Sequence, residues 1–148
     1  MDDNPALTAR VQAAFDRLGW AIDRRDWQAV TAVLSATVRL DYTELFGGEV
    51  STISGQQLSD QWRATLSGLD ATQHVITGVR ATAAADGSVT ATANVVAAHV
   101  QSADPGHSPW IIGGWYEAAL EQSGDHFTVS ALTLHPSWQT GSQEILSK

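Results

Sequence analysis

The chain has 148 residues, 43% of them hydrophobic, and a formal net charge of -8 at pH 7. This length suits one domain with its own core and is short for two, so we expect a single domain over residues 1–148. An acidic chain without a basic stripe offers little to a phosphate backbone or to an anionic lipid surface. We therefore expect neither nucleic acid nor a membrane among its partners.

The chain contains no cysteine, which excludes disulfides, thiolate zinc sites and cysteine nucleophiles. Its first residues lack the basic-then-apolar order of a signal peptide, and no apolar run reaches the roughly 20 residues that a bilayer-spanning helix needs. These features predict a cytoplasmic protein.

Helical periodicity dominates the first part of the chain. Within residues 6–23 apolar side chains recur three and four positions apart, which places them on one helix face: Leu7, Val11, Phe15, Leu18 and Ile22. Asp26 is the expected cap of a second, short helix through Leu34. Residues 38–43 then predict a short strand, and residues 44–54, with their glycine pair, predict a loop.

A third helix is expected from Ser54 or Gly55 to about Leu66, after which the sequence favours strands. Four β-rich stretches follow one another, at about residues 73–84, 88–102, 110–122 and 126–138. The segments between them, 85–87, 104–106 and 123–125, carry the turn residues that hairpins need. The pattern indicates an α+β domain in which an antiparallel meander wraps the helices, with residues 139–148 as a loose or accessory C-terminal tail.

Four ionisable residues, Asp23, Tyr42, His74 and His99, lie in short apolar or aromatic contexts. His99 shares its strand parity with valines and alanines, so we expect it to point inward toward a face with room to spare. The face that carries His74 is less uniform, and Asp23 lies at the boundary of the apolar helix stripe. If the fold brings the four together, they form a general acid/base site in an apolar pocket.

Each of these residues also has a structural interpretation. A single strand histidine is more often a satisfied core residue, and Asp23 could belong to a solvated turn. No two histidines stand two or four positions apart, so we expect no metal site. The remaining histidines fall at predicted loop or strand ends and are interpreted as surface residues: His107, His126 and His135.

Five short segments resemble scytalone dehydratase and, more broadly, the SnoaL-like branch of the nuclear transport factor 2 superfamily, over about residues 15–138. They are Asp23-Arg24-Arg25-Asp26-Trp27, Leu40-Asp41-Tyr42, Thr72-Gln73-His74, His99 late in a long strand, and Gly114-Trp115-Tyr116. The resemblance implies a cone of three helices packed in a strongly curved, mixed but mainly antiparallel sheet that encloses a pocket. It also implies that Asp23 orients His99, that both histidines share the proton transfers, that Tyr42 polarises a carbonyl, and that no metal or organic cofactor takes part.

The chain departs from that pattern in the pocket. Ile22 stands where the family has a tyrosine, and by our alignment Trp110 and Ile112 replace a serine and an asparagine. We expect a more apolar pocket, in which substrate contacts come from Ile22, Trp62, Leu66, Trp110 and Ile112.

The function implied is that of a cofactor-independent dehydratase acting on a hydrophobic, polyketide-like hydroxy-carbonyl compound. The alternatives are a SnoaL-like cyclase or isomerase, including one that opens epoxides, and a non-catalytic ligand-binding domain. Because the outer face of a bent sheet with apolar residues generally needs cover, we also expect a homodimer or homotrimer.

Overall fold

The computed structural model describes residues 4–101 and 108–147. Four α-helices and a short 3-10 helix pack with one six-stranded sheet, whose strand order is β2-β1-β6-β5-β4-β3. The expected α+β class with a mixed, mainly antiparallel sheet is confirmed, since only β1 and β6 run parallel. The expected turn at 104–106 lies outside the described residues.

Helix α1 (Pro5–Asp23) is the longest helix and lies in the hollow of the sheet. Asn4 caps its first turn by accepting a hydrogen bond from the backbone N–H of Leu7 (3.1 Å), and Pro5 occupies a first-turn position where no N–H is needed. The predicted apolar stripe is buried along its whole length. Because α1 ends at Asp23, this carboxylate stands at the edge of the helix core.

The second helix, α2 (Trp27–Val33), is capped as expected by Asp26, whose side chain accepts from the backbone N–H of Ala29. The first strand, β1 (Leu34–Asp41), begins four residues earlier than the sequence predicted. The prediction of a loop over residues 44–54 was wrong. This segment holds a one-turn helix, α3 (Thr43–Phe46), and an edge strand, β2 (Ser51–Ser54), that pairs with β1.

Helix α4 (Gly55–Leu66) starts where the sequence indicated, at a capping box in which Ser54 and Gln57 each bond the other's backbone N–H. The four remaining strands form the expected meander: β3 (Ala71–Ala83), β4 (Val89–Val100), β5 (Trp110–Ser123) and β6 (His126–Thr140). Along β4 burial alternates residue by residue, which confirms that His99 shares the inward face with the small side chains before it.

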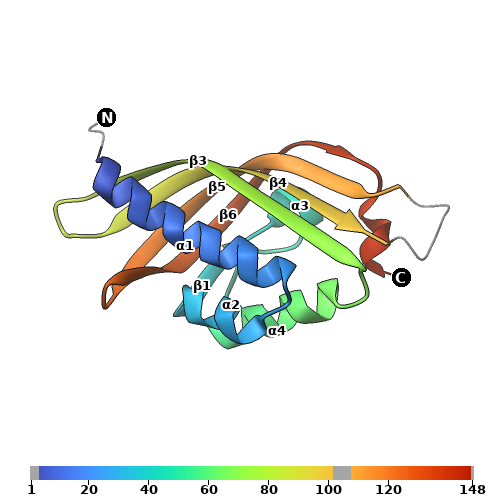
Figure 1. Ribbon diagram of the computed structural model, residues 1–148, viewed down its shortest axis with the longest axis horizontal. Helices are drawn as coiled ribbons and strands as arrows, with labels where there is room; N and C mark the ends of the chain where they lie inside the picture. The colour runs from blue at the N-terminus through green and yellow to red at the C-terminus, as the bar shows by residue number, and fades with distance from the viewer. Residues whose placement is uncertain (1–3, 102–107, 148) are drawn as a thin grey trace.

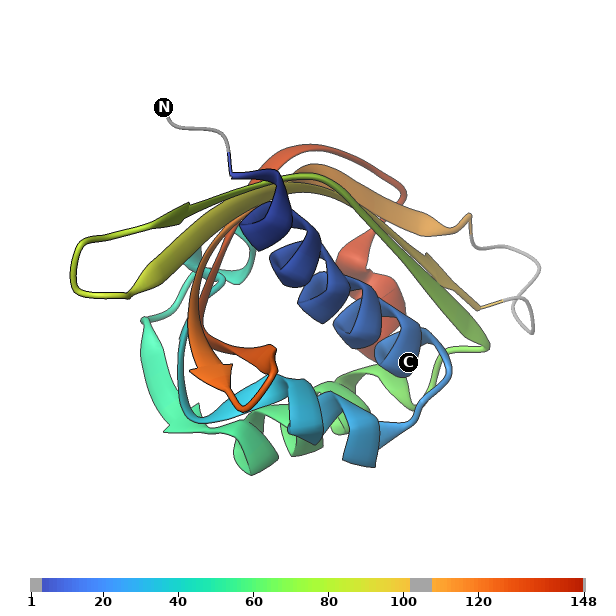
Figure 2. The same ribbon diagram turned by 60° about the vertical axis from the view of Figure 1, so that its left-hand side comes forward.

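The long strands arch over α1 and curl toward α2 and α4 (Figures 1 and 2). Register shifts interrupt the pairing of β3 with β4, β5 with β6 and β1 with β6, and such irregularities increase the local bend. The core fills the space between α1 and the concave face of this sheet. None of the helices in the described ranges is long and apolar enough to cross a membrane.

Most of the segment expected as a loose or accessory C-terminal tail has regular structure. Strand β6 continues to Thr140, and the 3-10 helix η1 (Gln143–Ser147) folds back onto the domain. Ile145 is only 2% exposed, and Leu146 packs against the core cluster. Two apolar residues in an otherwise polar stretch were the available signal.

Candidate active site

A cavity of about 270 Å³ opens between α1, α3, α4 and the concave face of the sheet. Its walls are mainly aliphatic and aromatic, and few polar groups reach it. All five expected substrate-contact residues line it: Ile22, Trp62, Leu66, Trp110 and Ile112. Tyr42, His74 and His99 line the same cavity, so three of the four predicted polar residues converge there. Asp23 stands directly behind His74.

The Asp23 carboxylate and the His74 ring form a close pair. Asp23 Oδ1 accepts a hydrogen bond from His74 Nδ1 at 2.7 Å, and the two side chains are only 13% and 11% exposed. Oδ2 accepts from the backbone N–H of His74 at 2.8 Å, and Oδ1 also accepts from the Thr72 hydroxyl at 3.0 Å. Three hydrogen bonds thus fix the carboxylate. Since a carboxylate only accepts, His74 carries its proton on Nδ1 and directs the lone pair of Nε2 elsewhere.

The expected pairing of Asp23 with His99 was wrong, because the carboxylate bonds His74 instead. His99 is 6% exposed and makes its own contact, with Nδ1 donating to the backbone carbonyl of Trp110 at 3.1 Å. Its ring stacks on the Trp110 indole with centroids 4.5 Å apart. His99 and Trp110 face each other across β4 and β5, so a main-chain acceptor is already within reach of the ring.

Burial dominates the acid–base behaviour of His99. It lowers the pKa of the imidazole to about 4, an effect that the Trp110 carbonyl and the distant Asp23 charge oppose and the nearby His74 reinforces. At neutral pH His99 is therefore uncharged, with its proton on Nδ1 and a lone pair on Nε2. The His74 and His99 rings meet edge to face with centroids 6.1 Å apart. The site thus presents two imidazoles, of which only His74 is backed by a carboxylate.

Two phenols, Tyr42 and Tyr116, line the cavity, together with the hydroxyl-bearing Thr65. Burial and then the neighbouring Tyr116 phenol raise the pKa of Tyr42 well above its ordinary value. Burial also raises the pKa of Tyr116, partly offset by its contact with Tyr42. Both phenols therefore stay protonated and can donate, although Tyr116 was not among the predicted site residues. Its inward parity on β5, one position from outward-facing Trp115, was the available signal.

Aromatic side chains close the cavity near α3. The Phe46 ring lies 6.4 Å from both the Tyr42 and the Trp110 rings, and it is 52% exposed although it also lines the cavity. Sequence reasoning missed Phe46 because it treated this segment as a loop. Leu146 of η1 adds a further apolar wall.

Two of the other histidines, His126 and His135, lie away from the cavity. His126 is on the surface, with 42% of its side chain exposed, whereas His135 is partly covered between two glutamates. His107 lies outside the described residues. Within residues 4–101 and 108–147 no group of three or more histidine, aspartate or glutamate side chains is arranged to hold a metal ion.

Solved structures of other proteins share this fold. The Kfla4162 protein from Kribbella flavida is 23% identical, with a TM-score of 0.86 over 95% of this chain and 96% of that one. A candidate scytalone dehydratase from Novosphingobium aromaticivorans is 10% identical, with a TM-score of 0.80 over 93% and 88%. A type 2 hexachlorocyclohexane dehydrochlorinase, LinA, is 16% identical, with a TM-score of 0.75 over 93% and 89%.

At these identities the likeness concerns the fold alone. The family assignment rests on the sequence itself. The profile of the SnoaL-like domain matches residues 6–133, which include Asp23, Tyr42, His74 and His99. The chain belongs to the SnoaL-like domain family.

Proposed function

We propose that this protein is a cofactor-independent lyase that removes water from an apolar hydroxy-carbonyl compound by acid–base catalysis. The observation that carries the proposal is the Asp23–His74 pair at the wall of an apolar cavity. A pocket that only binds apolar ligands gains nothing from a carboxylate that orients an imidazole. The names of two structural neighbours, a dehydratase and a dehydrochlorinase, both describe eliminations.

His74 is the base in this proposal. Asp23 holds the proton on Nδ1, so Nε2 is free to take the proton next to the substrate carbonyl. The imidazolium that forms is stabilised by the carboxylate 2.7 Å away. His99 does not start the reaction as an acid, because its lowered pKa keeps it neutral at pH 7.

Tyr42 supplies the donor for the developing enolate. Its raised pKa keeps the phenol protonated, and in a dry site a fixed O–H stabilises negative charge strongly. As the C–H bond breaks and the enolate collapses, the C–O bond to the β-hydroxyl breaks and a C=C bond forms. The proton held on His74 Nε2 passes to the departing hydroxide, which leaves as water, and the enzyme returns to its starting state.

His99 orients the substrate in this proposal. With Nδ1 occupied by the Trp110 carbonyl, His99 Nε2 accepts a hydrogen bond from the substrate hydroxyl. A positive charge on His74 disfavours one on His99, so the site carries one mobile proton at a time.

The cavity sets the class of substrate. Its volume of about 270 Å³ lies just below the usual range of small-molecule sites, about 300–1,000 Å³. This favours a compact cyclic compound with one carbonyl and one hydroxyl over an extended chain. The apolar walls select against phosphorylated or otherwise charged substrates.

Two measurements test the proposal. Hydroxylated cyclic ketones are first screened for thermal stabilisation, which identifies compounds that bind the folded state. Each hit is then incubated in D₂O, and mass spectrometry follows both deuterium uptake next to the carbonyl and loss of water. Wild-type protein should catalyse both, and His74→Gln neither. Binding without uptake or elimination for every hit would instead support a ligand-binding domain, and ring formation or rearrangement would support a cyclase or isomerase.

A further inference from the structure

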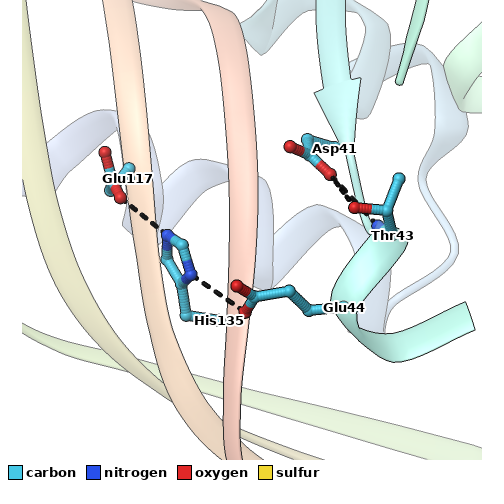
Figure 3. A network of polar contacts seen from close by, with 5 residues as sticks. All are labelled: Asp41, Thr43, Glu44, Glu117 and His135. Carbon is cyan, nitrogen blue, oxygen red and sulfur yellow. Dashed lines mark hydrogen bonds and ion pairs between the residues drawn. The ribbon is translucent and has the colours of Figure 1, made fainter. Parts of the chain in front are cut away.

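A three-residue network on the outer side of the sheet connects α3 to the meander. His135 of β6 lies between Glu44 of α3 and Glu117 of β5 (Figure 3), with Nδ1 3.0 Å from Glu44 Oε2 and Nε2 2.6 Å from Glu117 Oε1. The Trp115 indole stacks on the His135 ring with centroids 4.1 Å apart and fixes its plane. We call Glu44, His135 and Glu117 the clamp.

The geometry of the clamp requires a charged histidine. Both glutamates accept when ionised, so both ring nitrogens of His135 must carry protons, and only the imidazolium does. Partial burial lowers the pKa of His135, but the hydrogen bonds to Glu117 and Glu44 outweigh it and the pKa is raised overall. The clamp is thus complete below that pKa. The clamp loses one of its two hydrogen bonds as the pH rises above the pKa of His135.

The surrounding charges add to this effect. When His135 is neutral, the carboxylates of Glu44 and Glu117 flank an uncharged ring. Asp41, at the end of β1, is a further anion, and hydrogen bonds from the Thr43 hydroxyl and backbone N–H lower its pKa. The charges of Arg39 and of His135 also lower the pKa of Asp41. Above the pKa of His135 the clamp therefore keeps one hydrogen bond and loses the positive charge between the two carboxylates, which weakens the attachment of α3 to the sheet.

Helix α3 matters because it carries part of the cavity wall. Tyr42 is its N-cap residue, and Leu45 and Phe46 both line the cavity. Gly47 and Gly48 come directly after α3 with φ angles of +73° and +77°, which favour glycine. Because glycine has no side chain, this turn adds no side-chain contact that would hold α3 in place. In a helix of four residues, contacts with neighbouring elements fix the position more than internal hydrogen bonds do.

We infer that His135 is a positioning residue: as an imidazolium it holds α3 against the sheet through Glu44 and thereby places Tyr42 and Phe46 on the cavity wall. The consequence for turnover rests on the proposed function, since it assumes that Tyr42 faces the substrate carbonyl. The consequence for the wall itself does not depend on any substrate.

Hydrogen–deuterium exchange of peptides covering residues 42–47 tests the inference across pH 5.5 to 9, corrected for the intrinsic pH dependence with amides of β4 as reference. In wild-type protein, corrected exchange should rise roughly two- to fivefold as His135 loses its proton, the range expected for losing a largely exposed ion pair. His135→Gln should show the high value at every pH. The rise should shrink when 1 M salt screens the carboxylates.

His126→Gln is the matched control. It removes a histidine from the same strand whose ring contacts the exposed Asp125 at 3.4 Å and which lies outside the cavity. It should reproduce the wild-type pH profile, and thermal unfolding should show that both variants are folded. Glu44→Gln, which keeps the shape but removes the charge, should flatten the profile as His135→Gln does.

Equal exchange in wild type and His135→Gln at pH 6, or a flat wild-type profile, would overturn the inference. Turnover is measured separately once a substrate is known. If His135→Gln alters exchange and raises KM or lowers kcat with the same pH dependence, the positioning role extends to catalysis. If exchange responds while the Asp23–His74 pair proves dispensable for turnover, the proposed function fails and the clamp stands.

Discussion

Replacing Asp23 with asparagine exchanges one carboxylate oxygen for an NH₂ group, and this change should switch the tautomer of the neighbouring His74. The amide oxygen can still accept from the backbone N–H of His74, where Asp23 Oδ2 now lies at 2.8 Å. The NH₂ group then faces His74 Nδ1 at the position of Oδ1, and two donors cannot share that contact. His74 must therefore move its proton to Nε2, which leaves no base facing the substrate.

The size of the effect follows from two losses. The wrong tautomer removes general-base catalysis, and the missing carboxylate removes stabilisation of the imidazolium, so kcat should fall by about 10²- to 10⁴-fold. Stability should fall by only about 1–2 kcal/mol, because the backbone N–H of His74 keeps an oxygen acceptor while the contacts with the His74 ring and the Thr72 hydroxyl become neutral hydrogen bonds that the amide NH₂ donates. The assay is deuterium uptake next to the substrate carbonyl, read beside urea unfolding.

Thr72→Val is the matched control for this variant. It removes the third hydrogen bond to Asp23, from the Thr72 hydroxyl at 3.0 Å, while leaving the carboxylate and His74 paired. It should cost less than about tenfold in kcat, since the carboxylate keeps its charge and both of its hydrogen bonds to His74. A folded Asp23→Asn protein that keeps more than a tenth of wild-type kcat would refute the assignment of His74 as the carboxylate-backed base.

Three further changes probe other parts of the site. Between pH 6.5 and 4 the unfolded chain binds a proton at His99 that the folded chain does not, so the free energy of unfolding falls with falling pH, by roughly 3 kcal/mol for a pKa lowered from 6.5 to about 4. In urea unfolding, the free energy of unfolding of His99→Gln should fall by roughly 3 kcal/mol less than that of the wild type over this pH window. Parallel curves for the two proteins would contradict the buried neutral state. Tyr42→Phe should lower kcat about 10²-fold with little change in KM, because it removes a donor that acts mainly in the transition state; a change confined to KM would make Tyr42 a binding residue. Ala97→Leu places a larger apolar side chain in the cavity, so folding should be kept while thermal stabilisation by bound hydroxy-ketones disappears; retained stabilisation would place the ligand elsewhere.

The main elements could be predicted because each had a local cause. The apolar stripe of α1, the caps Asp26 and Ser54, and the alternation along β4 are all properties of neighbouring residues. The missed elements depended on distant partners. A four-residue helix and a four-residue edge strand have too little periodicity to recognise, and β2 exists because β1 lies beside it.

The same distinction applies to the site. That His99 points inward followed from parity, and that Asp23 stands at a helix boundary followed from its angle to the stripe. Which histidine Asp23 contacts depends on the strand order, and a meander pattern does not show which strand will lie beside the end of α1. The expectation of an Asp23–His99 pair, which came from the family resemblance, was wrong for this reason.

The edge of the sheet explains the observed partner. β3 is the last strand of the order, so it has a strand neighbour, β4, on one side only, and its outer backbone N–H groups need other acceptors. Asp23, at the last turn of α1, accepts one of these groups at His74, and the same carboxylate then reaches the ring of that residue. His99, on β4 between two strands, has the Trp110 carbonyl across the ladder. Asp23 thus pairs with His74 on the edge strand because a backbone donor there must be satisfied, and pairing Asp23 with His99 would leave that donor without its acceptor.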